Sequence, residues 1–152
     1  MKKRIITLVV ILAILGIAVA VIAPSYCDYS LRAKVAEGMV WVGDLKATVF
    51  EAFITDGMGG VADYSEMTSA YFSALAADKF FHITLQPTTG TIILVFDGLS
   101  ELGDFNTVAY VPSIDGVPIA DVPIEKNMGR FLWACNTALT TIDPQFLPMS
   151  CR

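Results

Sequence analysis

The sequence predicts an α+β fold, in which a long N-terminal α-helix packs on an antiparallel β-sheet of about four strands. Two patterns carry this prediction: apolar residues recur at helical spacing through the first third of the chain, and short segments of alternating character fill the second half. A third observation, a pair of cysteines near the C-terminus, predicts a region closed by a disulfide. With 152 residues, the chain is long enough for one domain with its own core.

Composition sets one segment apart from the rest. Hydrophobic residues make up 55% of the chain and charged residues only 16%, which is too apolar for an ordinary soluble domain. The formal net charge is -5, although Lys2, Lys3 and Arg4 stand together at the start. The remainder is strongly acidic, so nucleic acid is not expected as a direct specific ligand.

The apolar segment runs from Ile5 to Ala23 without a charge. At 1.5 Å per residue a helix of this length spans roughly 28 Å, about the thickness of a bilayer core. The positive-inside rule keeps Lys2 to Arg4 in the cytoplasm and places the chain from Pro24 onward outside. Cleavage as a secretory signal near Ala18 to Ala20 is the alternative to a permanent anchor, but the helical pattern continues beyond the segment.

After Pro24 the helix pattern becomes amphipathic. We expect one helix of about fifty residues, kinked near Pro24, that ends at the glycine cluster from Gly57 to Gly60 and opens there into a loop. The cluster lacks the Lys-Ser/Thr of a phosphate-binding loop, so it predicts a flexible connection. The apolar stripe that should pack on the chain's own domain consists of Leu31, Val35, Gly38, Val42, Leu45, Val49 and Phe53.

A short helix over Tyr64 to Lys79, with Ser65 as a possible cap, and four strands follow. Residues alternate between apolar and polar from Phe81 to Gln86, which is typical of a half-buried strand, and Pro87 to Gly90 have the chemistry of a turn. Short connections favour antiparallel pairing. The other three expected strands are Thr91 to Phe96, Thr107 to Val111 and Arg130 to Cys135.

The chain has three cysteines. A bridge between Cys135 and Cys151 would remove roughly 3 kcal/mol of loop entropy from the unfolded chain and hold the proline-containing tail to the last strand. Two unpaired buried thiols are the alternative. Cys27 is expected to be a small packing residue, with an intermolecular bridge or a lipid attachment site as alternatives.

Residues with catalytic or metal-binding chemistry are sparse. The single histidine, His82, alternates with apolar positions on an expected strand and has no nucleophile motif beside it. Asp97, Glu101 and Asp104 do not have the spacing of a calcium loop, and the histidine and cysteines do not form a zinc pattern. We therefore expect no catalytic residue, cofactor or metal, and no enzyme.

Both ends of the chain resemble type IV pilins, and among them the type IVa major pilin family. The first end combines the basic start, an apolar helix containing Gly16, the run Pro24-Ser25-Tyr26-Cys27-Asp28-Tyr29 and the Arg32-Ala33-Lys34-Val35-Ala36-Glu37 segment. The second combines Trp133-Ala134-Cys135 with Ile142-Asp143-Pro144 and the final Cys151-Arg152. The resemblance implies the same α+β fold and a disulfide-closed C-terminal region.

The resemblance also implies a function. It suggests a structural subunit of an extracellular filament on the bacterial surface that supports adhesion, surface motility or DNA uptake. Residues 1–24 would form the basic leader and the transmembrane and filament-core half of the helix, and residues 25–152 the globular head. Its partners would be identical subunits, the inner membrane before assembly, when the head lies in the periplasm, and the pilus assembly machinery. The expected filament-core residues are Leu8, Ile11, Leu12, Leu15, Gly16, Val19, Ile22 and Pro24.

The chain departs from the family pattern at its start. Pilin precursors usually have a cleavage glycine after the basic leader and a glutamate soon after the cut, but here no glycine precedes Gly16 and no glutamate lies between Met1 and Tyr29. Assembly is therefore expected to depend on apolar packing and only weakly on salt. The alternatives are a minor pilin or pseudopilin, and a membrane-anchored binding module that does not polymerise.

Overall fold

The computed structural model describes residues 2–76, 80–123 and 129–152. The chain divides into two compact units, Met1–Lys34 and Val35–Arg152, which we describe separately. The division expected from the sequence, at residues 24 and 25, stays a prediction.

Helix α1 spans Lys2–Ala76, and within it only Asp56 and Gly57 depart from helical backbone angles. The helix continues through Pro24, as expected. The expected apolar stripe is buried along its whole length, and Val35, Val42, Val49 and Phe53 are fully inaccessible to solvent. This burial confirms that the second half of the first helical segment packs on the chain's own domain.

The first helical segment ends at the start of the glycine cluster, as expected, but the expected loop was wrong, because a second helical segment follows at once. Gly57 has a positive φ of 58°, which turns the chain sharply, but Gly59 and Gly60 are helical and belong to a second segment of residues 58–76. A Cβ on Gly60 would lie 2.5 Å from the carbonyl oxygen of Ala52, so the missing side chain lets the second segment start close to the end of the first.

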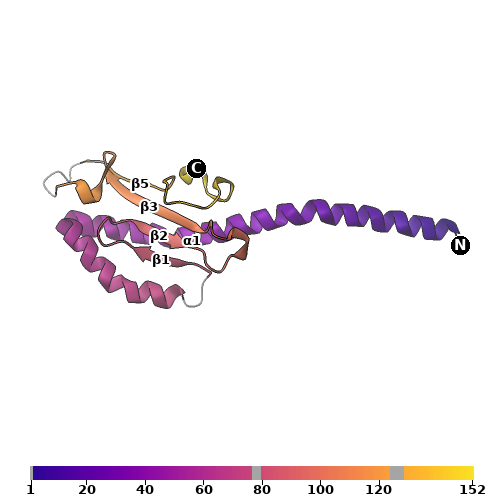
Figure 1. The fold of residues 1–152 in the computed structure, drawn as a ribbon, viewed down its shortest axis with the longest axis horizontal. Helices are drawn as coiled ribbons and strands as arrows, with labels where there is room; N and C mark the ends of the chain where they lie inside the picture. The colour runs from indigo at the N-terminus through magenta and orange to yellow at the C-terminus, as the bar shows by residue number, and fades with distance from the viewer. Residues whose placement is uncertain (1, 77–79, 124–128) are drawn as a thin grey trace. The chain divides into compact units, whose positions relative to one another are not determined.

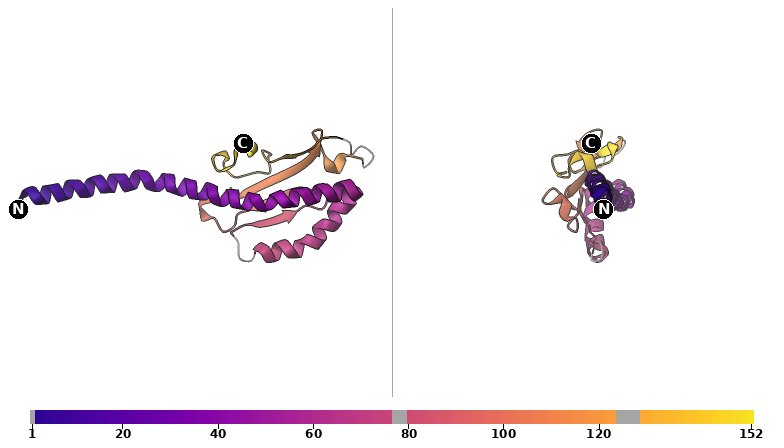
Figure 2. Two further views of the ribbon diagram at one scale, coloured as in Figure 1. Left: turned by 180° about the vertical axis from the view of Figure 1, so that it is seen from behind. Right: turned by 90° about the vertical axis from the view of Figure 1, so that its right-hand side faces the viewer.

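The second helical segment therefore begins before Tyr64, and residues 77–79 lie outside the described part. Ser65 is inside this segment and is not a cap. Its Oγ donates a hydrogen bond of 2.9 Å to the carbonyl oxygen of Leu85, which fixes the segment beside β1. Figures 1 and 2 show the first segment of α1 crossing the sheet and its second segment returning beside β1.

The sheet is antiparallel throughout and contains the four expected strands with small changes at their ends. In the described residues these strands are β1 (His82–Leu85), β2 (Ile92–Val95), β3 (Thr107–Ile114) and β5 (Phe131–Ala134). β2 pairs with both β1 and β3, and β5 pairs with the second half of β3.

A two-residue strand, β4 (Val117–Pro118), also pairs with the end of β3 and was not expected. Asp115 and Gly116 join the two strands with positive φ angles of 50° and 86°. Asp-Gly is the preferred pair for such a two-residue hairpin turn, so the signal was present in the sequence.

The core of the second unit lies between α1 and the sheet. Ile92 and Leu94 of β2, and Phe96 directly after β2, are almost fully buried together with the helix stripe. Gly38 allows a close approach between the helix and this side of the sheet, since a Cβ there would lie 2.6 Å from Cε1 of Phe96. These contacts position the head's sheet against one face of the helix.

Cys135 and Cys151 are joined by a disulfide with their Cα atoms 5.0 Å apart, which confirms the predicted closure of the C-terminal region. The connecting chain is tied to β3 as well. Thr140 Oγ1 donates to the carbonyl oxygen of Cys135 at 2.6 Å and accepts from the amide of Ala109 at 3.1 Å. A further hydrogen bond lies within this region: Arg152 Nε donates to the carbonyl oxygen of Leu147 at 2.9 Å.

Candidate functional site

The first unit presents an extended apolar surface along its helix. Lys2–Ala20 is long and apolar enough to cross a membrane, with a mean hydropathy of 2.4. Its large apolar side chains from Ile5 to Val19 are each 51–67% exposed within the described structure. A surface of this kind carries no catalytic groups; it suits lipid tails or the helices of other subunits.

The predicted filament-core residues share this surface as far as the structure describes them. The exposed members are Leu8, Ile11, Leu12, Leu15 and Val19. A Cβ on Gly16 would have no described atom within 4 Å, so the helix offers a flat place for close approach. Ile22 and Pro24 lie on α1, but their side chains are outside the described part.

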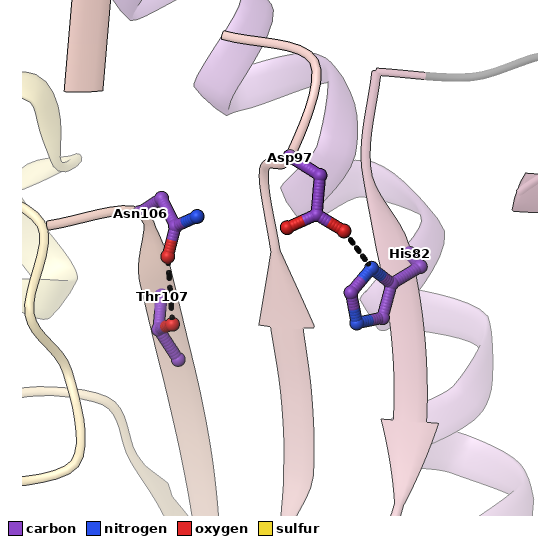
Figure 3. Close-up of polar contacts among 4 residues, drawn as sticks. All are labelled: His82, Asp97, Asn106 and Thr107. Atoms are coloured by element: carbon purple, nitrogen blue, oxygen red, sulfur yellow. Dashed lines mark hydrogen bonds and ion pairs between the residues drawn. The ribbon is translucent and has the colours of Figure 1, made fainter. Parts of the chain in front are cut away.

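His82 lies on β1 and forms an ion pair with Asp97, which follows β2 (Figure 3). His82 Nδ1 is 2.6 Å from Asp97 Oδ2, and the two side chains are 42% and 62% exposed. In the same view Thr107 Oγ1, at the start of β3, donates to Oδ1 of the preceding Asn106 at 3.2 Å. Because both members of the ion pair face solvent, they form a surface contact between neighbouring strand ends.

The acidic residues considered as a calcium loop do not form a metal centre. Asp97, Glu101 and Asp104 are exposed, and the described residues contain no group of three His, Cys, Asp or Glu side chains placed to hold a metal ion. A cleft of about 350 Å³ lies near Glu101, lined also by Phe105, Asp143 and Phe146. The cleft lies between the loop that follows β2 and the disulfide-closed region.

Lys46 forms an interaction that the sequence did not single out. Its Nζ lies 3.6 Å from the ring centroid of Tyr110 and 5.8 Å from that of Trp133. Burial lowers the pKa of Lys46 and raises the pKa of Tyr110 to about 12. This cation-π contact stabilises the packing of the helix on β3 and β5; the signal for it was a lysine next to the buried Leu45 on the amphipathic helix.

Comparisons with known proteins agree with this architecture. Residues 31–152 match the sequence pattern of pilins, the bacterial filament proteins. The chain is 25% identical to the fimbrial protein EcpC of Eikenella corrodens over 97% of this chain and 87% of that protein. It is 28% identical to a fimbrial protein of Moraxella nonliquefaciens, over 94% of this chain and 90% of the relative.

Over about half of each chain, the identity reaches 34% with the type IV major pilin protein PilE of Neisseria gonorrhoeae, covering 49% of this chain and 48% of PilE. No solved structure gives a significant match. The match to the family pattern covers most of the chain, including the amphipathic part of α1, the sheet and the disulfide-closed end. The chain therefore belongs to the pilin family, a structural family of bacterial filament proteins.

Proposed function

We propose that this chain is the repeating structural subunit of an extracellular type IV pilus on the bacterial surface, and that it carries no catalytic activity of its own. The observation that carries the proposal is the row of large apolar side chains from Ile5 to Val19, exposed by more than half each, on a member of a filament-forming family. Such a surface requires a partner, because leaving it in water is unfavourable by about 1.5–3 kcal/mol per large side chain.

The apolar segment has two successive environments in this proposal. Before assembly it spans the inner membrane, with Lys2 to Arg4 in the cytoplasm and the head in the periplasm. After extraction by the pilus assembly machinery it packs among identical helices in the filament core. Contacts between different faces of neighbouring copies do not close into a ring, so they extend as a helical filament.

The core contacts would be made by Leu8, Ile11, Leu12, Leu15, Gly16, Val19, Ile22 and Pro24. Residues 1–24 would thus act as the assembly half of the chain and residues 25–152 as the displayed head. Without a glutamate in the first 29 residues, subunit contacts in the core rest on apolar packing, so raising the salt concentration should leave filaments intact. Adhesion, surface motility or DNA uptake would follow from display and retraction of the filament.

A deletion strain complemented with variants tests this function. Filaments sheared from the complemented cells and viewed by electron microscopy should contain this chain as their main protein. Gly16→Leu keeps the segment apolar but blocks close helix approach, so it should abolish filaments while the subunit remains in the membrane. Val10→Leu, also in the apolar segment, is the matched control and should assemble normally.

Three outcomes would contradict the proposal. Filaments that persist in the deletion strain would show that another protein builds them. A trace amount of the chain in abundant filaments would indicate a minor pilin. A chain that stays in the membrane without forming filaments would indicate an anchored binding module.

A further inference from the structure

Helix α1 carries a second apolar row on the face away from the core. It consists of Ala36, Val40, Gly43, Ala47, Phe50 and Ile54, which we call the outer seam. All six residues are exposed, including Val40 at 74%, Ile54 at 49% and Phe50 at 40%. At 100° per residue, the outer seam lies about 140° around the helix from the buried stripe.

The spacing of the outer seam is that of a coiled coil. The residues alternate by four and three, with Val40, Ala47 and Ile54 at heptad positions a and Ala36, Gly43 and Phe50 at positions d. The middle of the seam is small, at Gly43 and Ala47, and its far end is large, at Phe50 and Ile54, so a second helix could approach closely at the middle and pack on large side chains at that end.

The flanking charges specify the direction of that second helix. Position e is acidic three times, as Glu37, Asp44 and Glu51. The g positions five residues before them hold Arg32, Met39 and Lys46, and the last g position, Phe53, is buried in the core. An antiparallel copy would bring the acidic rows of the two helices together. A parallel copy instead pairs position g with position e of its partner five residues later, which sets Arg32 against Glu37 and Lys46 against Glu51.

These two pairs are not equal. Arg32 is exposed and free to turn toward a second helix, whereas Nζ of Lys46 lies over the ring of Tyr110. The pair of Arg32 and Glu37 should therefore supply most of the charge specificity.

We propose that two membrane-anchored copies of this chain pair in parallel and in register through the outer seam. This rests on the membrane anchorage in the proposed function, because identical copies anchored by the same segment hold equivalent residues at the same height above the bilayer. The contact uses the same surface on both copies, so it closes as a twofold dimer and differs from the open contacts that build a filament. The dimer would be a form of the subunit that exists before assembly.

Disulfide cross-linking in membranes tests the pairing. In a Cys27→Ser background, Ala36→Cys should give a covalent dimer of the full-length chain under mild oxidation, because residues at the same seam position face each other in a parallel pair. Thr55→Cys, exposed on α1 but outside the outer seam, is the matched control and should stay monomeric. In an antiparallel pair aligned over the seam, Ala36 would lie about 27 Å from its counterpart and opposite Ile54.

Two further variants distinguish specific pairing from cross-linking by random encounters in the membrane. Ile54→Asp places an unpaired charge in the seam and should lower the yield of the Ala36→Cys dimer about tenfold. Glu37→Lys should lower the yield by opposing Arg32, and adding Arg32→Glu should restore it, because the pair is then reversed rather than lost.

The pairing is overturned if Ala36→Cys gives no dimer, if Thr55→Cys dimerises equally well, or if only the combination of Ala36→Cys and Ile54→Cys cross-links. Filaments counted in the same cells distinguish the two proposals. Filaments without the membrane dimer would overturn the pairing alone, whereas the dimer without filaments would support the pairing and count against the filament function.

Discussion

The contact between Gly38 and Phe96 allows a sharp test of how the helix packs on the sheet. Gly38→Ala adds a Cβ whose position lies 2.6 Å from Cε1 and 2.9 Å from Cζ of Phe96. Carbon atoms in good contact are 3.5–4.0 Å apart, so the ring would have to move by about 1 Å. Phe96 is 1% exposed and lies against the rings of Phe80 and Phe81, which leave it little room.

The magnitude follows from two opposing contributions. Replacing a helical glycine by alanine gains up to about 1 kcal/mol in helix propensity, and forcing extra volume into a packed core costs about 1–3 kcal/mol. Gly43→Ala is the matched control, because Gly43 lies on the same helix and a Cβ there meets no described atom within 4 Å. Gly43→Ala should stabilise the head by about 1 kcal/mol, and Gly38→Ala should fall about 1–3 kcal/mol below it.

Urea unfolding of the monomeric, detergent-solubilised chain, followed by tryptophan fluorescence, measures this difference. Both tryptophans, Trp41 and Trp133, lie in the head, so the signal reports on the second unit. If Gly38→Ala stabilised the head as much as Gly43→Ala does, the close approach of α1 to β2 would be refuted.

Three further predictions concern the head. Replacing both Cys135 and Cys151 by serine should lower its unfolding free energy by about 2–4 kcal/mol, seen as a lower urea midpoint; an unchanged midpoint would show that the bridge contributes nothing. Because the pKa of Tyr110 is raised in the folded chain, the unfolded chain loses the phenolic proton at a lower pH than the folded chain does. The free energy of unfolding should therefore fall by about 2 kcal/mol between pH 10 and 12. Tyr110→Phe keeps the ring under Lys46 and should remove that fall in parallel urea titrations, and equal pH profiles would contradict it. Asp97→Asn should change stability by less than about 1 kcal/mol, because its ion pair with His82 is exposed; a larger loss in the same assay would assign it a structural role.

The sequence predicted the elements whose pattern is local. The stripe from Leu31 to Phe53 has the helical period, and the residues from Phe81 to Gln86 alternate as a strand does, because each pattern directly reflects which face is buried. The disulfide was predictable because the two cysteines lie 16 residues apart near the C-terminus, on either side of a short proline-containing segment.

The loop expected at the glycine cluster was a wrong prediction, because the glycines of the cluster have different structural roles. Only Gly57 adopts a positive φ, whereas Gly60 makes room for the carbonyl of Ala52, a contact between two helical segments that local propensity does not reveal. Lys46 was missed for a similar reason, since Tyr110 and Trp133 reach it from strands that are distant in the chain. The spacing of the outer seam is present in the sequence, but the exposure of its side chains follows only from the structure, in which the sheet packs on another face of α1.

The central claim is that the apolar segment from Ile5 to Ala23 remains in the mature subunit and is buried among copies of itself. An electron cryomicroscopy reconstruction of filaments sheared from cells tests this claim directly. We predict a central bundle of parallel helices in which the side chains of Leu8, Leu12 and Leu15 contact neighbouring subunits. Filaments whose subunits begin beyond Ala23, or whose heads meet without a helical bundle at the centre, would contradict the account.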